Sequence, residues 1–278
     1  MIRALRSSLF RFFKTGLFVK VLIFSIVMPL LVITRTAMDD LNLLPFQQPR
    51  YINNEFILLN LATLVYVIPF ASAIFTSIFT GNDVQSRAIN NKIATGISRT
   101  QIFLSDFILS IIVTEISLVM FVIVFFIYGK YAPVKGNVSL NGYMIHVIVC
   151  IMIICAAFTA VYTLLQFFSN NKLLGLVLAI LIIPALLFSN EYINDKLNEP
   201  YRVYCVDEDK GGYWMENGEY IGGFPRTALT FIYNTSPYTF KYLEKEKTTV
   251  YMEAEAAGAV VLVSVVSGIA CIKKKEYP

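Results

Sequence analysis

Long apolar runs alternate with short polar segments along the chain, and this pattern defines the class of protein. Hydrophobic residues make up 56% of the 278 and charged residues 15%, whereas soluble domains average about 25% charged residues. A membrane-spanning helix needs about 20 apolar residues, and in hydrocarbon each such run must be helical to satisfy its backbone groups. The sequence therefore predicts an all-α polytopic membrane protein with six transmembrane helices. These runs are Leu17–Thr34, Phe56–Phe79, Ile102–Tyr128, Tyr143–Phe168, Leu173–Ser189 and Ala256–Ile272.

Lysine and arginine are concentrated in the segments that six spans would place on one side of the membrane. Twelve of them lie in the N-terminal segment, the connectors after the second and fourth runs and the C-terminal tail, against four in the opposite short loops. Because positive charge is retained in the cytoplasm, both termini are expected to be cytoplasmic. An odd number of spans would put one of the two basic ends outside.

The chain divides into four parts on this basis. Residues 1–16 interleave aromatic residues and arginines at helical spacing, which predicts a cytoplasmic amphipathic helix; the alternative is a basic cap that only orients the first span. Residues 17–189 hold spans one to five, with a polar segment at 81–101. Residues 190–255 form a long outer loop, and residues 256–278 hold the sixth span and a basic cytoplasmic tail.

The outer loop at 190–255 is acidic overall and rich in tyrosine. It is too aromatic for a disordered tether, so a small extracellular subdomain is expected between spans five and six. Gly211–Gly212 and Gly222–Gly223 are expected as turns, and residues 222–240 as a return towards the membrane. The subdomain is either a gate or cargo surface, or a folded lid that only anchors.

The polar segment at 81–101, GNDVQSRAINNKIATGISRTQ, is the best candidate for contact with a soluble partner. A helix there would present an apolar stripe to the bundle and a polar rim, including Gln85 and Lys92, to the cytoplasm. Gly96 is expected to end this helix in a left-handed turn, and Ser98 to cap the third span. The alternative is an ordinary cytoplasmic turn whose basic residues follow the positive-inside rule. The stripe consists of Val84, Ala88, Ile89, Ile93 and Ile97.

One ionisable residue, Glu115, lies deep in an expected span. It is either a substrate or proton site, or a neutral carboxyl that bridges helices with Thr114 or Ser117. The sequence contains no phosphate-binding loop, no nucleophile elbow and no His-Glu-x-x-His motif, and its single histidine excludes a multi-histidine metal site. No enzyme activity, catalytic residue, metal site or nucleic-acid partner is therefore expected in this chain.

The connector resembles that of permease subunits of bacterial type-2 ATP-binding-cassette exporters. These subunits have six spans with both ends inside, and a short helix between spans two and three docks on a separate ATPase chain. Arg87 and Ala88 stand where that family commonly has Gly-Thr, and Asp106 stands where a lysine often opens the third span. The resemblance implies ATPase-coupling roles for Asp83, Arg87, Asn90, Asn91, Lys92, Ser98 and Arg99.

The resemblance further implies a complex in the bacterial cytoplasmic membrane. Its expected partners are an ATPase subunit that binds ATP and Mg²⁺, a second permease copy or paralogue, and the lipid bilayer; this chain itself needs no cofactor. The expected function is outward movement of a hydrophobic or amphipathic substrate such as a peptide, lipid or drug, and self-protection against membrane-active peptides is one such role. The alternatives are an ATP-independent secondary transporter and a membrane sensor or immunity subunit.

Overall fold

A computed structural model describes residues 1–41, 54–86, 88–131, 141–169, 171–207, 211–237 and 247–274. In these ranges six helices are long and apolar enough to cross a membrane, so the chain is a multi-pass membrane protein and the predicted helical class is confirmed. The spans are α2 (Leu17–Leu41), α3 (Asn54–Thr76), α6 (Arg99–Tyr131), α7 (Gly142–Ser169), α8 (Lys172–Asn198) and α10 (Lys247–Lys274).

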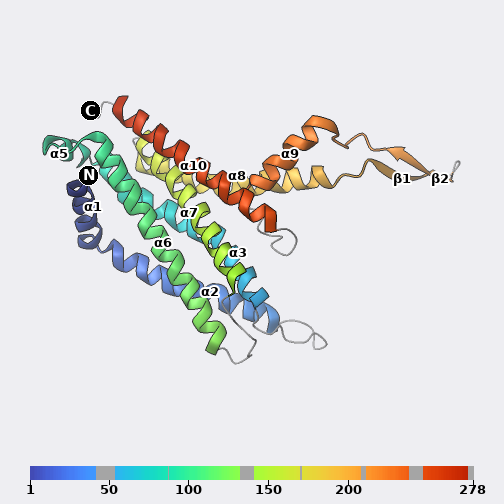
Figure 1. Cartoon of the computed structure of the whole chain (residues 1–278), viewed down its shortest axis with the longest axis horizontal. Helices are drawn as coiled ribbons and strands as arrows, with labels where there is room; N and C mark the ends of the chain where they lie inside the picture. The colour runs from blue at the N-terminus through green and yellow to red at the C-terminus, as the bar shows by residue number, and fades with distance from the viewer. Residues whose placement is uncertain are drawn as a thin grey trace.

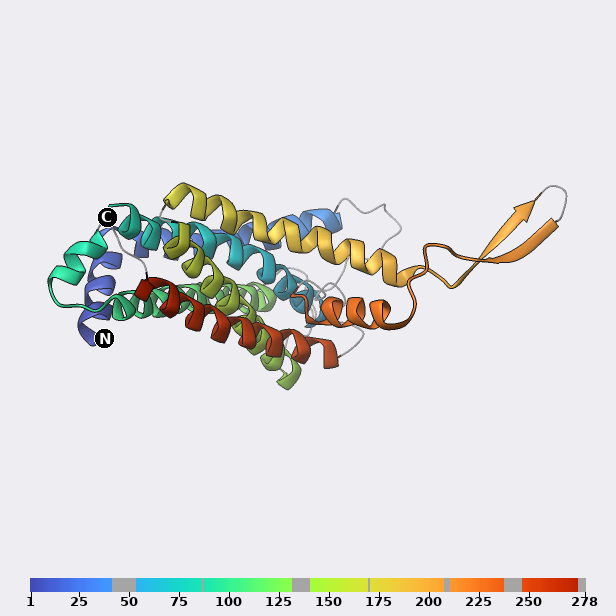
Figure 2. The same cartoon turned by 90° about the horizontal axis from the view of Figure 1, so that it is seen from above.

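The short elements lie at the two ends of this bundle. Helix α1 (Ile2–Lys14), the π-helical turn η1 (Ser77–Gly81), α4 (Asn82–Gln85) and α5 (Ala88–Ala94) lie near one end. Strands β1 (Arg202–Asp207) and β2 (Gly211–Glu216) and helix α9 (Gly223–Thr235) lie towards the other. The start of α1 and the end of α10 lie at the α1 and α5 end of the bundle, and the hairpin projects past the opposite end (Figures 1 and 2). This arrangement is the one that six crossings require.

Helix α7 lies at the centre of the bundle and packs against α10, α3, α6 and α8. The core at its faces is apolar, with fully buried side chains such as Leu61, Phe121 and Tyr162. Close packing also depends on a small residue at Gly268 in α10, because a Cβ atom there would come within 2.1 Å of the Phe103 ring. Helix α2 packs mainly along α6 and α1.

The segment between the fifth and sixth spans differs from the expectation in three respects. Helix α8 continues without interruption to Asn198, well past the expected end of the span at Ser189, and α10 begins at Lys247 rather than at Ala256. Gly211 and Gly212 belong to β2 and not to a turn. Helix α9 packs against α8 and α10, so this part of the chain does return to the bundle.

A buried ion network under the connector

The connector between the second and third spans begins as a direct extension of α3. Helix α3 passes through η1 into α4, so the helical path is unbroken from Asn54 to Gln85. The Ser77 hydroxyl in η1 donates a hydrogen bond to the Lys172 carbonyl at the start of α8 (3.1 Å). The single helix expected between Val84 and Ile97 is instead two helices, α4 and α5.

The end of the connector is built as the sequence predicts. Gly96 has φ +83°, and the amides of Gly96 and Ile97 donate to the carbonyls of Ile93 (2.9 Å) and Lys92 (3.2 Å). These two bonds form a Schellman motif. The Ser98 hydroxyl then accepts from the Gln101 amide (3.3 Å), and the Gln101 side chain accepts from the Ser98 amide (3.4 Å). This reciprocal capping box fixes the start of α6.

Apolar side chains hold the connector against the bundle. Val84 and Ile89 are buried with Ile102 and Phe103 of α6 and Phe167 of α7. The predicted residues Ile93 and Ile97 pack at the edge of the same cluster. The apolar stripe therefore faces the membrane helices, as expected.

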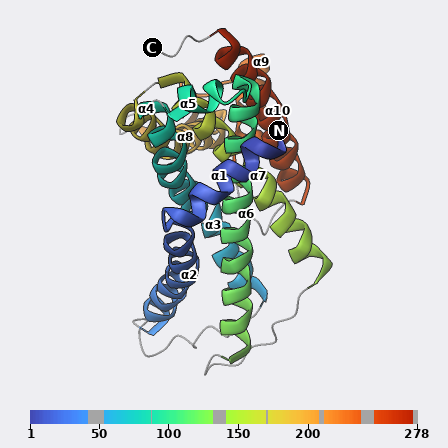
Figure 3. The same ribbon diagram turned by 90° about the vertical axis from the view of Figure 1, so that its left-hand side faces the viewer.

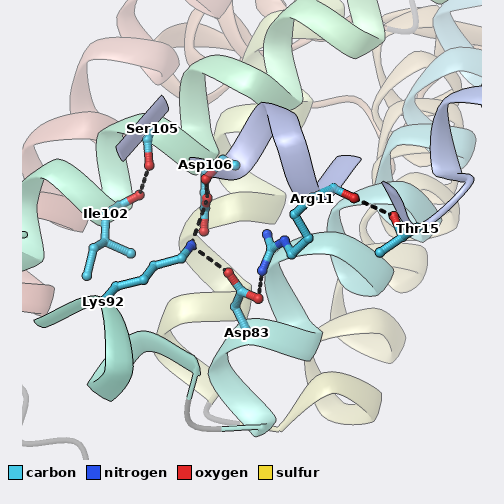
Figure 4. A network of polar contacts seen from close by, with 8 residues as sticks. Arg11, Thr15, Asp83, Lys92, Ile102, Ser105 and Asp106 are labelled. Carbon is cyan, nitrogen blue, oxygen red and sulfur yellow. Dashed lines mark hydrogen bonds and ion pairs between the residues drawn. The ribbon is translucent and has the colours of Figure 1, made fainter. Parts of the chain in front are cut away.

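Four charged side chains from four elements meet beside this cluster (Figure 4). Asp83 of α4 is ion-paired with both Arg11 of α1 and Lys92 of α5, the second at 2.7 Å between Nζ and Oδ2. The Lys92 ammonium also lies 3.8 Å from Oδ1 of Asp106 in α6. The Ser8 hydroxyl of α1 donates to the same Asp106 oxygen (2.8 Å). The two aspartates are 3% and 0% exposed, so the pairs are formed away from bulk water.

The network balances two cations with two carboxylates, which is the condition for keeping charge buried. Burial lowers the pKa of the Lys92 ammonium, and nearby Asp106 opposes this shift. Burial likewise lowers the pKa of the Arg11 guanidinium, again against the attraction of Asp106. One carboxylate oxygen of Asp106 has no hydrogen-bond partner within the described ranges. The network is therefore charge-balanced but not fully hydrogen-bonded.

Helix α1 supplies one wall of the network. Ala4, Ser8 and Phe12 recur at helical spacing and are buried, and the helix lies across the end of α6 and α2 (Figure 3). The Phe12 ring meets Phe75 and Phe79 edge-on, and the Arg11 guanidinium lies 4.0 Å from the centre of the Phe79 ring. Arg11 thus faces the protein interior.

The seven residues expected to contact an ATPase do not share one environment. Asp83 and Lys92 turn inward, so Lys92 is not part of an exposed polar rim as expected. Asn91 and Ser98 are exposed, Asn90 and Arg99 are half-buried, and Arg87 lies outside the described residues. The sequence reasoning missed Ser8, Arg11 and Asp106 as partners. The available signal was Asp106, a carboxylate in an apolar span.

The buried carboxylate Glu115 lies in α6, and a second, Glu253, lies in α10. Both Glu115 oxygens are buried without a hydrogen-bond partner in the described part of the chain. The expected bridge to Thr114 or Ser117 is wrong, because these hydroxyls donate to the carbonyls of Ser110 and Val113. Glu253 is 2% exposed and was not singled out from the sequence. In the described ranges no three His, Cys, Asp or Glu side chains lie close enough to share a metal ion.

A cavity of about 520 Å³ lies between α2, α3, η1, α6 and α8. Its walls are apolar, with Phe24, Met28 and Phe75 among the lining residues. The hydroxyls of Ser72 and Ser117 on its wall donate to carbonyls of their own helices. The cavity therefore presents mainly hydrocarbon surface, which suits an apolar molecule.

Comparison of the chain with protein-family models, with curated proteins and with solved structures gives no match. The fold and the ion network define the class, a multi-pass helical membrane protein with a structured connector at one end of its bundle.

Proposed function

We propose that the chain is the membrane-spanning permease subunit of an ATP-driven exporter of the type-2 ATP-binding-cassette class. The observation that carries this proposal is the attachment of the connector. Helix α4 is continuous with the second span, Lys92 of α5 pairs with Asp83, and Asp106 of the third span lies within 4 Å of the same ammonium. A displacement of α5 is therefore shared by two spans and by α1.

The surface of the connector that faces away from the bundle suits a soluble partner. Asn91, Thr95 and Ser98 are exposed, while Val84, Ile89, Asp83 and Lys92 face the bundle. In the proposed complex, a separate ATPase that binds ATP and Mg²⁺ docks on these exposed residues. Closure of the ATPases would move α5, and the ion network would carry that movement to α3, α6 and α1.

The proposed complex contains two six-span chains, identical or paralogous, in the cytoplasmic membrane of a bacterium. Its cargo is hydrophobic or amphipathic, which the apolar cavity between α2, α3, α6 and α8 supports. A peptide, a lipid and a drug all fit this description. The cavity is lined in part by α3 and α6, the two spans that the connector joins. A displacement of α5 would therefore be passed to helices that line the cavity.

Purification of the tagged chain in mild detergent, with identification of the proteins that copurify, tests the docking. We expect a stoichiometric ATPase with the native chain and its loss in N91R, which places charge and bulk on the exposed side of α5. T227R is the control, since Thr227 is exposed on α9 at the other end of the molecule. A chain recovered alone, or an N91R variant that retains the ATPase, contradicts the proposal. Lys92 is unsuitable for this test because its replacement also breaks the ion network.

A secondary transporter is the second candidate, and the Glu115 carboxyl, which has no hydrogen-bond partner among the described residues, favours it. Such a protein would move cargo in proteoliposomes with a proton gradient and without an ATPase, and E115Q would abolish that movement. ATP-dependent transport that is unchanged in E115Q would leave Glu115 a structural residue.

A further inference from the structure

The cavity between α2, α3, η1, α6 and α8 is elongated along the helices. Its wall on α2 runs from Leu17 to Met28, and its wall on α3 and η1 runs from Tyr66 to Ile78. At a rise of about 1.5 Å per residue, each wall is roughly 16–18 Å long. The hydrocarbon of one leaflet is about half of 30 Å thick. The cavity therefore extends over about one leaflet, from the α1 end of the bundle towards the middle of the membrane.

The cavity is open along one side. Phe70 and Ile74 of α3 and Leu187 of α8 line it, and these side chains are 46%, 38% and 37% exposed. Val113 of α6 also lines it and is only 5% exposed, so α6 forms the inner wall. In a bundle of membrane-spanning helices, the open side at this depth faces lipid hydrocarbon. A lipid chain can therefore enter the cavity sideways without crossing water.

One charged side chain lies on the described walls of this cavity, that of Lys20. Lys20 belongs to the stripe of α2 that faces the cavity, because Leu17, Phe24 and Met28 line it at helical spacing. It lies near the start of α2, so it is at the α1 end of the cavity. Within the described ranges Lys20 forms no ion pair. The cavity is thus an apolar slot with a cation available at its membrane-surface end.

We propose that the cavity binds one acyl chain of an anionic phospholipid from the leaflet next to α1, with the lipid phosphate beside the Lys20 ammonium. The chain alone gives no preference among lipids, because lipid tails are as apolar as the cavity walls. The preference comes from the headgroup, since basic residues at a membrane surface attract anionic lipids. The role of this lipid as cargo rests on the proposed exporter function, whereas its binding does not require an ATPase.

A second copy of the chain fits the cavity less well than a lipid does. At the α1 end, the carboxylates of the described residues are those of Asp83 and Asp106, which are 3% and 0% exposed. Both are held in the ion network. The described residues of a second copy therefore offer no exposed carboxylate to Lys20 at this depth.

An extended peptide also fits less well. Its backbone groups would need hydrogen-bond partners inside the cavity, and the wall hydroxyls of Ser72 and Ser117 already donate to carbonyls of their own helices. An acyl chain has no polar groups to satisfy. A single-chain lipid tail with an anionic headgroup at one end therefore matches both the walls and the charge.

Lipid binding to the delipidated chain in detergent, measured by native mass spectrometry, tests the role of Lys20. The chain is titrated with dioleoyl phosphatidylglycerol or with dioleoyl phosphatidylcholine. We expect phosphatidylglycerol to bind about threefold to fivefold more tightly, as one lysine near an anionic headgroup provides. K20Q should remove this preference. K273Q is the matched control, since Lys273 is exposed at the same end of the bundle on α10, and it should keep the preference.

Filling the cavity tests where the acyl chain lies. Ala71 lines the cavity, so A71W should reduce the binding of phosphatidylglycerol at least tenfold. A259W is its control, because Ala259 is exposed on α10 and does not line the cavity. No ATPase is present in these experiments, so lipid binding and ATPase docking are tested separately.

Three outcomes would overturn the inference. The first is equal binding of the two phospholipids to the native chain. The second is a K20Q variant that keeps the preference, or an A71W variant that binds phosphatidylglycerol as the native chain does. The third is oleate binding as tightly as phosphatidylglycerol, because the occupant would then be a free fatty acid and not a phospholipid.

Discussion

Replacement of Asp83 by asparagine tests whether the ion network holds the connector in place. Asp83 is 3% exposed and is paired with both Arg11 and Lys92. Asparagine keeps the shape of the side chain and removes its charge. Arg11 and Lys92 then share one carboxylate, Asp106, and one positive charge is left uncompensated inside the protein.

The size of the effect follows from this geometry. Removing one partner of a buried ion pair costs about 3–5 kcal/mol. The side chains of Arg11 and Lys92 are 25% and 13% exposed, so water reaches them in part and the lower end of this range applies. A loss of about 3 kcal/mol corresponds to a decrease in Tm of roughly 6–12 °C for a chain of this size, at about 2–4 °C per kcal/mol.

The assay is thermal unfolding in detergent, followed by a thiol-reactive dye that reports exposure of the buried Cys150 and Cys155. D83N, K92M and the double variant are compared. The double variant leaves one cation and one carboxylate, so it should be less destabilised than the two single variants together by about 2 kcal/mol. E219Q is the control, since it breaks an exposed pair with Lys196 (2.8 Å) and should leave Tm unchanged.

Additivity of D83N and K92M within about 0.5 kcal/mol would refute this reasoning, because independent sites behave in that way. A double variant that is as stable as the native chain would instead support it. It would also indicate that the network exists for positioning more than for stability.

Three further predictions rest on local geometry. In α10, G268A should lower the free energy of unfolding by about 1–3 kcal/mol, because the added methyl group overpacks against Phe103. G258A is the control, since no atom lies within 4 Å of its added carbon, and it should leave Tm unchanged or raised. Equal effects of the two variants in thermal unfolding would contradict this prediction. G96A should cost about 1 kcal/mol because φ is +83° there, and a stabilised variant would exclude the left-handed end of α5. Burial lowers the pKa of Lys92 from its ordinary 10.5, so between the folded pKa and 10.5 the unfolded chain binds more protons than the folded one, and stability should rise with pH in that window. A K92M variant should lose part of this increase. An identical pH dependence of stability in K92M would contradict a lowered pKa at Lys92.

The sequence predicted those features that depend on neighbouring residues or on the solvent. The six spans follow from hydrophobic length, because hydrocarbon leaves no alternative to a helix. The left-handed turn at Gly96 and the cap at Ser98 follow from residues within four positions of one another. Turns and caps of this kind can be predicted from the neighbouring residues without knowledge of the fold.

The ion network could not be predicted in the same way. Its members come from α1, α4, α5 and α6, and the Ser8–Asp106 bond alone joins residues 98 positions apart. Lys92 was expected on an exposed polar rim because lysine side chains are mostly exposed. It turns inward because two aspartates lie within 4 Å of its ammonium. The hairpin was missed for another reason, since Gly211–Gly212 is typical of a turn and here belongs to a strand.

The π-helical turn at Ser77–Gly81 sets the rotational phase of everything that follows it in the second span. Such a turn is equivalent to one extra residue in an α-helix, and one residue corresponds to a rotation of about 100° around the axis at 3.6 residues per turn. Without η1, Asp83 would leave the side of the helix that faces Arg11 and Lys92. A single extra residue at the end of the second span thus decides which side chains Asp83 of the connector meets.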